Sequence, residues 1–149
     1  MQPAPEPHCR SDGLHLVFLA SPLAVRDNLA QMLAAPPLRD LSPDGRGTAE
    51  LVLAEVLNNI GEHAYPDGPG PVWVTLTAVA DGTQCLLVDQ GIAMPHERLP
   101  VGQLPSTDTA LEDLPEGGFG WHLIHSLTHD LIYLRTGGCN RLSFLLPQA

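Results

Sequence analysis

Three short polar and glycine-rich segments, spaced about 30 residues apart, constrain this chain more than any other feature. They are Glu55-Val56-Leu57-Asn58-Asn59 with His63 following, Asp89-Gln90-Gly91, and Glu116-Gly117-Gly118-Phe119-Gly120. Backbone N–H groups of successive glycines bind phosphates, and side-chain oxygens bind the divalent cation that accompanies them. In this order, the segments outline a nucleotide pocket.

The chain contains no lysine, and its seven basic residues are all arginines. A Walker A loop and the protein kinases of eukaryotic type both require a lysine, so neither is compatible with this sequence. The formal net charge of −10 argues against direct binding of nucleic acid. An acidic protein that binds ATP needs a cation as mediator; alternatively, its negative surface faces a basic protein partner.

The length of 149 residues predicts a single folded domain over 13–149, preceded by a disordered N-terminal tail over 1–12. No apolar run is long enough to span a membrane, and the N-terminus lacks a signal-peptide pattern. Cys9, Cys85 and Cys139 have no CxxC spacing, which argues against a disulfide framework or a zinc site. A reducing, cytoplasmic location is expected.

Apolar periodicity and turn residues predict the element order β-α-α-β-β-α-β-β, with a long lid-like loop over 91–116. The second helix has a start signal at Ser42-Pro43, but Gly45 and Gly47 weaken its first turn, so its firm part is expected to begin at Thr48. The expected elements are strands over 14–19, 72–80, 84–89, 131–135 and 141–146, helices over 22–35, 48–64 and 120–128, and a type I′ turn at Asp81-Gly82. This order predicts an α+β fold, a two-layer α/β sandwich with helices on one face of a mixed, mainly antiparallel sheet.

On the helix over 48–64, the residues Leu53, Val56, Leu57, Ile60 and Ala64 form an apolar stripe. Glu55, Asn59 and then Glu62 or His63 share another face of that helix. Polar groups aligned on a largely buried helix are costly without partners, which favours a site over a solvated face. Asn59 can offer an oxygen to Mg²⁺, and Glu55 can accept a proton from a water or a hydroxyl.

Asp89 ends a strand just before Gly91. Its carboxylate can accept a hydrogen bond from the exocyclic amine of adenine, and Gly91 allows close approach of the base. Taken alone, the pair also fits an ordinary strand-end turn.

Gly117, Gly118, Phe119 and Gly120 open the last predicted helix. Their N–H groups and the helix dipole form an anion cradle, although a lid hinge without a ligand has the same sequence pattern.

The histidines His122, His125 and His129 are placed on one face of this last helix, but they lack a carboxylate at metalloprotease spacing. A solvated or partner-facing surface is therefore favoured over a metal site. His63 is interpreted as a group that orients Asn59 or the neighbouring loop, with a packed core histidine as the alternative.

Together, the three segments resemble the N, G1 and G2 boxes of the GHKL ATPase and kinase superfamily, which has the Bergerat fold. The stretches 55–65 (EVLNNIGEHAY), 116–127 (EGGFGWHLIHSL) and 138–142 (GCNRL) are similar to the anti-sigma-factor serine/threonine kinases of the switch-protein type. The resemblance extends over about 14–146.

The resemblance implies that Glu55 is the catalytic base, that Asn59 binds Mg²⁺ and that Asp89, with Gly91 beside it, contacts adenine. It implies that Gly118 and Gly120 frame the triphosphate of ATP. The implied reaction transfers the γ-phosphate to a serine or threonine of a small antagonist protein. A sigma factor is the implied second partner, and the kinase is expected to be a homodimer.

Two features depart from the family pattern. Ala93 stands where the G1 box often has its last glycine, and the expected lid holds a single arginine, Arg98, among several acids. Both favour an alternative hypothesis, a non-catalytic module that sequesters a partner protein and keeps a degenerate nucleotide pocket. A third hypothesis, a detached histidine-kinase catalytic domain, is disfavoured because no phosphoacceptor helix hairpin is predicted.

Overall fold

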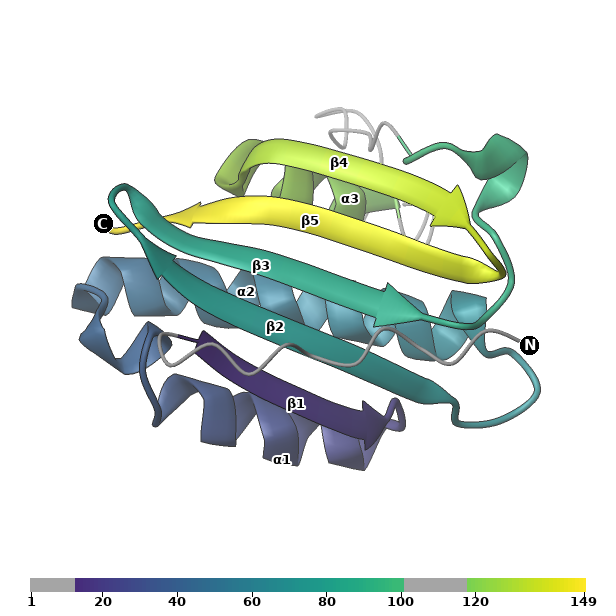
Figure 1. Cartoon of the computed structure of the whole chain (residues 1–149), viewed down its shortest axis with the longest axis horizontal. Coiled ribbons are helices and arrows are strands. Elements are labelled where there is room, and N and C mark those ends of the chain that lie inside the picture. Colours follow the sequence, from purple (N-terminus) through teal and green to yellow (C-terminus); the bar gives the residue numbers. More distant parts are fainter. Residues whose placement is uncertain (1–12, 101–117) are drawn as a thin grey trace, which may run out of the picture.

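The structure is a computed structural model that describes residues 13–100 and 118–149. One five-stranded sheet, in the order β1-β2-β3-β5-β4, is covered on one face by α-helices (Figure 1). Its strands are β1 (Gly13–Leu19), β2 (Pro71–Val79), β3 (Gly82–Asp89), β4 (His129–Thr136) and β5 (Cys139–Pro147). The helices are α1 (Pro22–Leu33), α2 (Pro43–Asn59) and α3 (Gly118–Leu127), with short turns η1 (Leu38–Asp40), η2 (Ile60–Ala64) and η3 (Pro95–Glu97).

The predicted α+β, two-layer sandwich is confirmed, and so is the predicted order of its elements. Each pairing between the described strands is antiparallel, so the sheet shows no parallel component in this part of the chain. The expected N-terminal tail over 1–12 and most of the expected lid lie outside the described residues.

The second helix begins earlier than expected, at Pro43 rather than at Thr48. The Ser42 hydroxyl accepts a hydrogen bond from the Gly45 N–H at 3.0 Å, which satisfies one of the free donors of the first turn. A side chain at Gly45 would lie 2.5 Å from the carbonyl oxygen of Gln148. This glycine therefore allows the helix to pack against the C-terminal segment and does not break it.

The β2–β3 turn is also displaced from its predicted position by one residue. Val79 pairs with Gly82, which leaves Ala80 and Asp81 as the two turn residues. Asp81 has no positive φ, so the predicted type I′ turn at Asp81-Gly82 is wrong. Gly82 is the first residue of β3 and has a φ of 151°, and a side chain there would overlap the carbonyl oxygen of Leu146.

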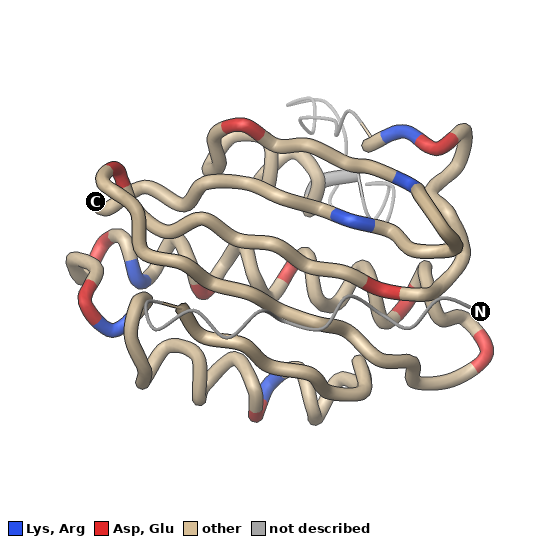
Figure 2. Tube along the Cα trace, viewed as in Figure 1, with Lys and Arg blue, Asp and Glu red and all other residues tan. Residues whose placement is uncertain are grey.

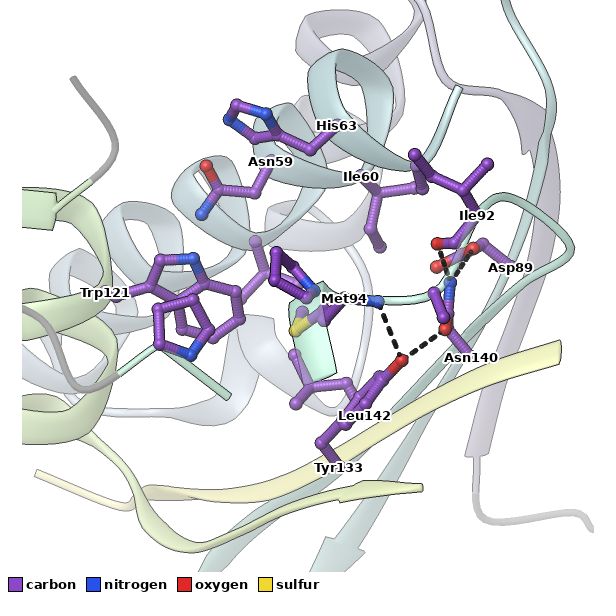
Figure 3. A pocket seen from close by; sticks show the side chains of 15 residues that line it. Asn59, Ile60, His63, Asp89, Ile92, Met94, Trp121, Tyr133, Asn140 and Leu142 are labelled. Carbon is purple, nitrogen blue, oxygen red and sulfur yellow. Dashed lines mark hydrogen bonds between the residues drawn. The ribbon is translucent and has the colours of Figure 1, made fainter. Parts of the chain in front are cut away.

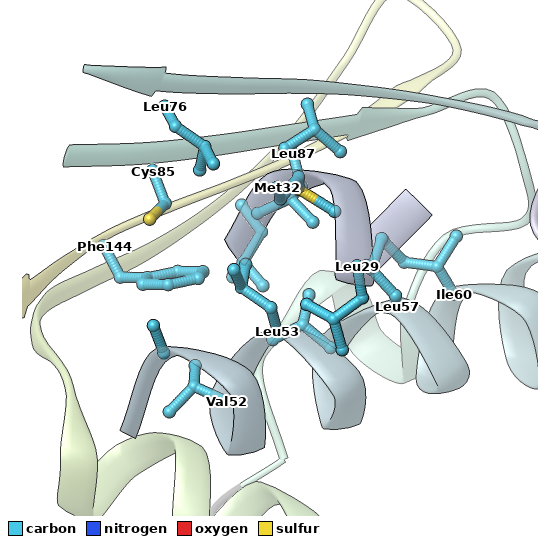
Figure 4. Packing of buried hydrophobic residues seen from close by; sticks show 14 of the residues in the cluster. Leu29, Met32, Val52, Leu53, Leu57, Ile60, Leu76, Cys85, Leu87 and Phe144 are labelled. Atoms are coloured by element: carbon cyan, nitrogen blue, oxygen red, sulfur yellow. The ribbon is translucent and has the colours of Figure 1, made fainter. Parts of the chain in front are cut away.

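The hydrophobic core lies between the sheet and α1 and α2 (Figure 4). Alternation along β5 directs every second side chain into this layer. Fully burying one such leucine or phenylalanine stabilises the fold by about 1.5–3 kcal/mol. The predicted apolar stripe of the second helix is confirmed as part of this core: Leu53, Val56, Leu57, Ile60 and Ala64.

The helical path of α2 continues into η2, a five-residue π-helix over Ile60–Ala64. Short π-helical insertions change the rotation of a helix and are frequent at functional sites. After it, the Tyr65 hydroxyl donates to the Pro71 carbonyl at 2.6 Å and accepts from the Gln90 N–H at 2.7 Å. Tyr65 therefore joins the end of this helix to the starts of β2 and of the loop after β3.

None of the described helices combines the length and the apolar composition needed to cross a bilayer. The described arginines are spread over several elements of the chain (Figure 2).

Candidate nucleotide-binding site

A cavity of about 470 Å³ lies between α2, α3 and the β3–β5–β4 part of the sheet. Its walls are mainly apolar, and its polar groups come from few residues (Figure 3). An apolar cavity of this size with a few polar groups is typical of small-molecule sites. Its lining is Val56, Asn59, Ile60, His63, Ala64, Asp89, Ile92, Ala93, Met94, Pro95, Pro100, Trp121, Tyr133, Asn140 and Leu142.

Glu55 and Asn59 lie one turn apart on α2, where the first turn of α3 approaches that helix. A methyl group added at Gly120 would lie 2.5 Å from Oε2 of Glu55 and 4.0 Å from Nδ2 of Asn59. The absence of a side chain at Gly120 therefore lets α3 approach both polar groups. The structure brings together three of the residues that the sequence indicates for the site.

The side-chain amide of Asn59 carries an unpaired polar atom. Its Nδ2 is buried, with no hydrogen-bond partner among the described residues. A buried polar atom without a partner costs about 1–3 kcal/mol, and such a group is frequently paired by a ligand or a water. The oxygen and nitrogen of an amide can exchange places by rotation, so Asn59 is suited to place an oxygen on a cation.

No cluster of three or more His, Cys, Asp or Glu side chains within residues 13–100 and 118–149 is arranged to hold a metal ion. Mg²⁺ commonly takes only one or two protein ligands and completes its shell with phosphate oxygens and water. The residues present therefore fit a cation that enters with a nucleotide.

Asp89, at the end of β3, is buried and lines the cavity. Its Oδ1 accepts hydrogen bonds from the Gly91 N–H at 2.9 Å and from Nδ2 of Asn140 at 2.8 Å. Burial raises the pKa of this carboxyl above its usual range, while Asn140, Gly91 and the charge of Arg135 lower it. Oδ2 accepts no hydrogen bond from a described residue, so it is the oxygen that can meet a ligand.

Gly91 lies where the backbone after β3 touches the end of the α2–η2 segment. The Ile92 N–H donates to the Ala64 carbonyl oxygen at 2.9 Å, and a side chain at Gly91 would overlap that oxygen. The glycine is therefore required by the contact between loop and helix, in addition to any approach by a base. Ala93, two residues on, lines the cavity.

His63 lies at the rim of the cavity with its side chain 67% exposed. Its Nε2 lies 3.7 Å from Oε2 of Glu62. The alternative of a packed core histidine is therefore wrong. A role in orienting Asn59 finds no supporting contact among the described residues.

The third segment is described only in part. Gly118 is the first residue of α3, which confirms that glycines open this helix; Gly117 and the side chain of Phe119 lie outside the described residues. His122 and His125 are on α3, but the helix ends at Leu127 and His129 begins β4. The predicted three-histidine helix face is therefore wrong in its last member.

The lining residues that were not singled out from the sequence include Trp121, Tyr133 and Asn140. Trp121 is 5% exposed and closes the α3 side of the cavity. The Tyr133 hydroxyl donates to Oδ1 of Asn140 at 2.5 Å, and Asn140 in turn holds Asp89. The signal that could have found Asn140 is its position on β5, in the same alternation as the core residues Leu142 and Phe144.

An apolar cavity with an aspartate at the end of a strand, beside a helical asparagine and a glycine-opened helix, defines a nucleotide-binding domain of two-layer α/β architecture. The family model described as "Histidine kinase-like ATPase domain" matches residues 19–146, and the chain belongs to this family. This confirms the GHKL resemblance.

Curated relatives include the serine-protein kinase RsbW of Bacillus cereus (strain ATCC 10987 / NRS 248) and that of Bacillus mycoides (strain KBAB4). Each is 26% identical over 90 residues, which cover 60% of this chain. The match spans 56% of each relative, little more than half its length.

Proposed function

We propose that this chain is an ATP- and Mg²⁺-dependent protein serine/threonine kinase of the anti-sigma-factor type. The observation that carries the proposal is the placement of Glu55 and Asn59 one turn apart against the start of α3. Of these two residues, Asn59 lines the cavity together with Asp89, whereas Glu55 lies beside it, at Gly120. A proton acceptor, a cation ligand and a base-recognising carboxylate are the three functions that such a kinase needs. The similarity to proteins named serine-protein kinase supports the same class.

In the proposed mechanism, Oδ2 of Asp89 accepts a hydrogen bond from the amino group of adenine, and the apolar walls enclose the base. The amide oxygen of Asn59 holds Mg²⁺, which when bound neutralises charge on the phosphates. N–H groups at the start of α3 bind phosphate oxygens. The Glu55 carboxylate takes the proton of the acceptor hydroxyl. At the same time, the oxygen of that hydroxyl bonds to the γ-phosphorus, and the bond between the γ-phosphorus and the ADP oxygen breaks.

The proposed phosphoacceptor is a small antagonist protein, and a sigma factor is the proposed second partner. Both come from the resemblance of the three segments to the anti-sigma-factor kinases, and the relatives named serine-protein kinase support the kinase class alone. We propose in addition that the kinase acts as a homodimer, away from membranes and nucleic acid.

The test of this function is transfer of label from γ-³²P-ATP to a protein acceptor in an extract of the host. Wild type is expected to label a small protein with acid-stable phosphoserine or phosphothreonine. Glu55→Gln keeps the size of the side chain but removes the base, so transfer should fall by at least about 100-fold while ATP affinity is retained. An unchanged transfer rate in Glu55→Gln excludes Glu55 as the base, and an acid-labile product favours phosphohistidine.

A second candidate is a non-catalytic module that sequesters a partner. The observation that favours it is that no arginine is among the described residues lining the cavity, so none of them adds a cation against the charge that develops during transfer. ATP binding without any transfer, in the presence of a partner that the chain retains on a column, would support this alternative.

A further inference from the structure

Three side chains of the β4–β5 hairpin hold the loop that forms the mouth of the cavity. This loop, residues 91–94, follows β3, and its residues 92–94 belong to the lining (Figure 3). Arg135 Nη1 donates to the carbonyl oxygen of Gly91 at 2.7 Å. Asn140 Nδ2 donates to the carbonyl oxygen of Ile92 at 2.8 Å. The Tyr133 hydroxyl accepts from the N–H of the last residue of the loop at 3.1 Å. The loop is therefore fixed from the sheet through its backbone.

Asn140 is the centre of this arrangement, and its hydrogen-bonding capacity is fully used. The two N–H groups of Nδ2 go to Asp89 Oδ1 and to the loop, each at 2.8 Å. Its Oδ1 accepts from Tyr133 at 2.5 Å and from Arg135 at 3.1 Å. Because Nδ2 faces two acceptors and Oδ1 faces two donors, only one orientation of the amide satisfies all four hydrogen bonds. Asn140 is 5% exposed and has no free group for a ligand, so it acts through Asp89.

The consequence is a defined presentation of the Asp89 carboxylate. Oδ1 is occupied by Asn140 and by the Gly91 N–H, which leaves Oδ2 as the acceptor for a ligand. A fixed acceptor favours a ligand with an N–H donor at that point and disfavours one that presents an oxygen.

We propose that Asn140, held by Tyr133 and Arg135, is a positioning residue that determines base specificity. It holds Asp89 so that the pocket distinguishes a 6-amino purine from a 6-oxo purine. This inference rests on the proposed function in one respect, namely that a purine nucleotide fills the cavity.

The test compares the affinities of ATP and ITP, which differ only in the purine base, for the intact chain. Wild type should prefer ATP by about 100-fold or more, since a carboxylate facing the 6-oxo group is repelled. Asn140→Ser should weaken ATP by about tenfold and reduce the ATP:ITP ratio by a similar factor, because Asp89 loses its orienting donor.

Tyr133→Phe keeps the ring and removes the hydroxyl that holds both Asn140 and the loop. It should reduce the same ratio by about threefold to tenfold. This variant carries the test if Asn140→Ser fails to fold.

The control is Thr128→Val, which removes a buried hydroxyl that donates to the Ile124 carbonyl at 2.6 Å, outside the cavity lining. It should lower the melting temperature without changing the ATP:ITP ratio.

Wild type that binds ATP, together with folded variants that keep its ATP:ITP ratio, overturns this inference alone. A wild type that binds neither nucleotide overturns the proposed function, and the inference with it.

Discussion

The Oε2 atom of Glu55 lies where a side chain at Gly120 would be, 2.5 Å from the position of such a methyl group. The helix that bears the proposed base and the helix that begins with glycines therefore meet without an intervening side chain. This contact gives Gly120 a steric role in the placement of the Glu55 carboxylate, independently of any phosphate bound there.

Gly120→Ala should displace the Glu55 carboxylate while leaving the fold nearly unchanged. The atom in conflict is the end of a flexible side chain, so stability should change by less than about 1 kcal/mol, whereas transfer should fall by at least about tenfold. The matched control is Gly47→Ala in α2, where the added methyl group has no neighbour within 4 Å. That variant should gain about 0.5–1 kcal/mol of stability and keep its activity. Equal activity in the two variants would contradict the proposed placement of Glu55.

Asp89→Asn should weaken ATP binding without lowering the stability of the fold at pH 7. Burial raises the pKa of the Asp89 carboxyl in the folded protein. An acid with a raised folded-state pKa favours folding when protonated; this contribution is present below the unfolded pKa and is lost as pH rises through the folded one. The amide that replaces the carboxyl does not titrate, so the variant should equal or exceed wild type in melting temperature at pH 7, and that advantage should shrink as pH falls toward about 4.

Thermal melts of both proteins between pH 7 and pH 4 measure this difference. ATP affinity of Asp89→Asn should fall by at least about tenfold, because a donor replaces the free acceptor Oδ2. A variant that is less stable at pH 7 than wild type, yet binds ATP normally, would refute the role assigned to Asp89.

Asn59→Ala should remove the Mg²⁺-dependent part of ATP affinity with little loss of stability. Its Nδ2 is buried without a partner among the described residues. Truncation therefore removes the free-energy cost of burying this unpaired group, and it also removes some packing contacts. Calorimetry with and without Mg²⁺ and a thermal melt give both quantities. The exposed Asn58 on the same helix provides the control variant Asn58→Ala. Retained Mg²⁺ dependence in Asn59→Ala would exclude Asn59 as the ligand.

The sequence predicts most of this fold because its apolar periodicity and turn residues agree with the packing. The stripe on α2 and the alternation on β5 both point into one core. The errors arose where a distant contact decides a local structure. From the sequence, Gly45 indicates a weak helix start, whereas in the structure it allows α2 to pack against the carbonyl oxygen of Gln148. Gly82 likewise indicates a turn, whereas in the structure it allows β3 to approach the carbonyl oxygen of Leu146.

The sequence could indicate those polar residues of the candidate site that lie in a recognisable motif and line the cavity, as Asn59 and Asp89 do. The residues that hold the site in place were not predictable from the sequence. Tyr133, Arg135 and Asn140 act through hydrogen bonds to residues about 40 to 50 positions away in the chain. A polar side chain on the core-facing side of a strand is the general signal for such residues, since it needs a buried partner. The π-helical end of α2, which accompanies the outward turn of His63, has no comparable signal in the sequence.

The most direct measurement is a calorimetric titration of ATP into the wild-type chain, first with Mg²⁺ and then with a chelator. Binding at one site that weakens markedly when the metal is removed is the predicted result, because the cavity supplies a carboxylate for the base and Asn59 for the cation. Absence of binding under both conditions would contradict the nucleotide site.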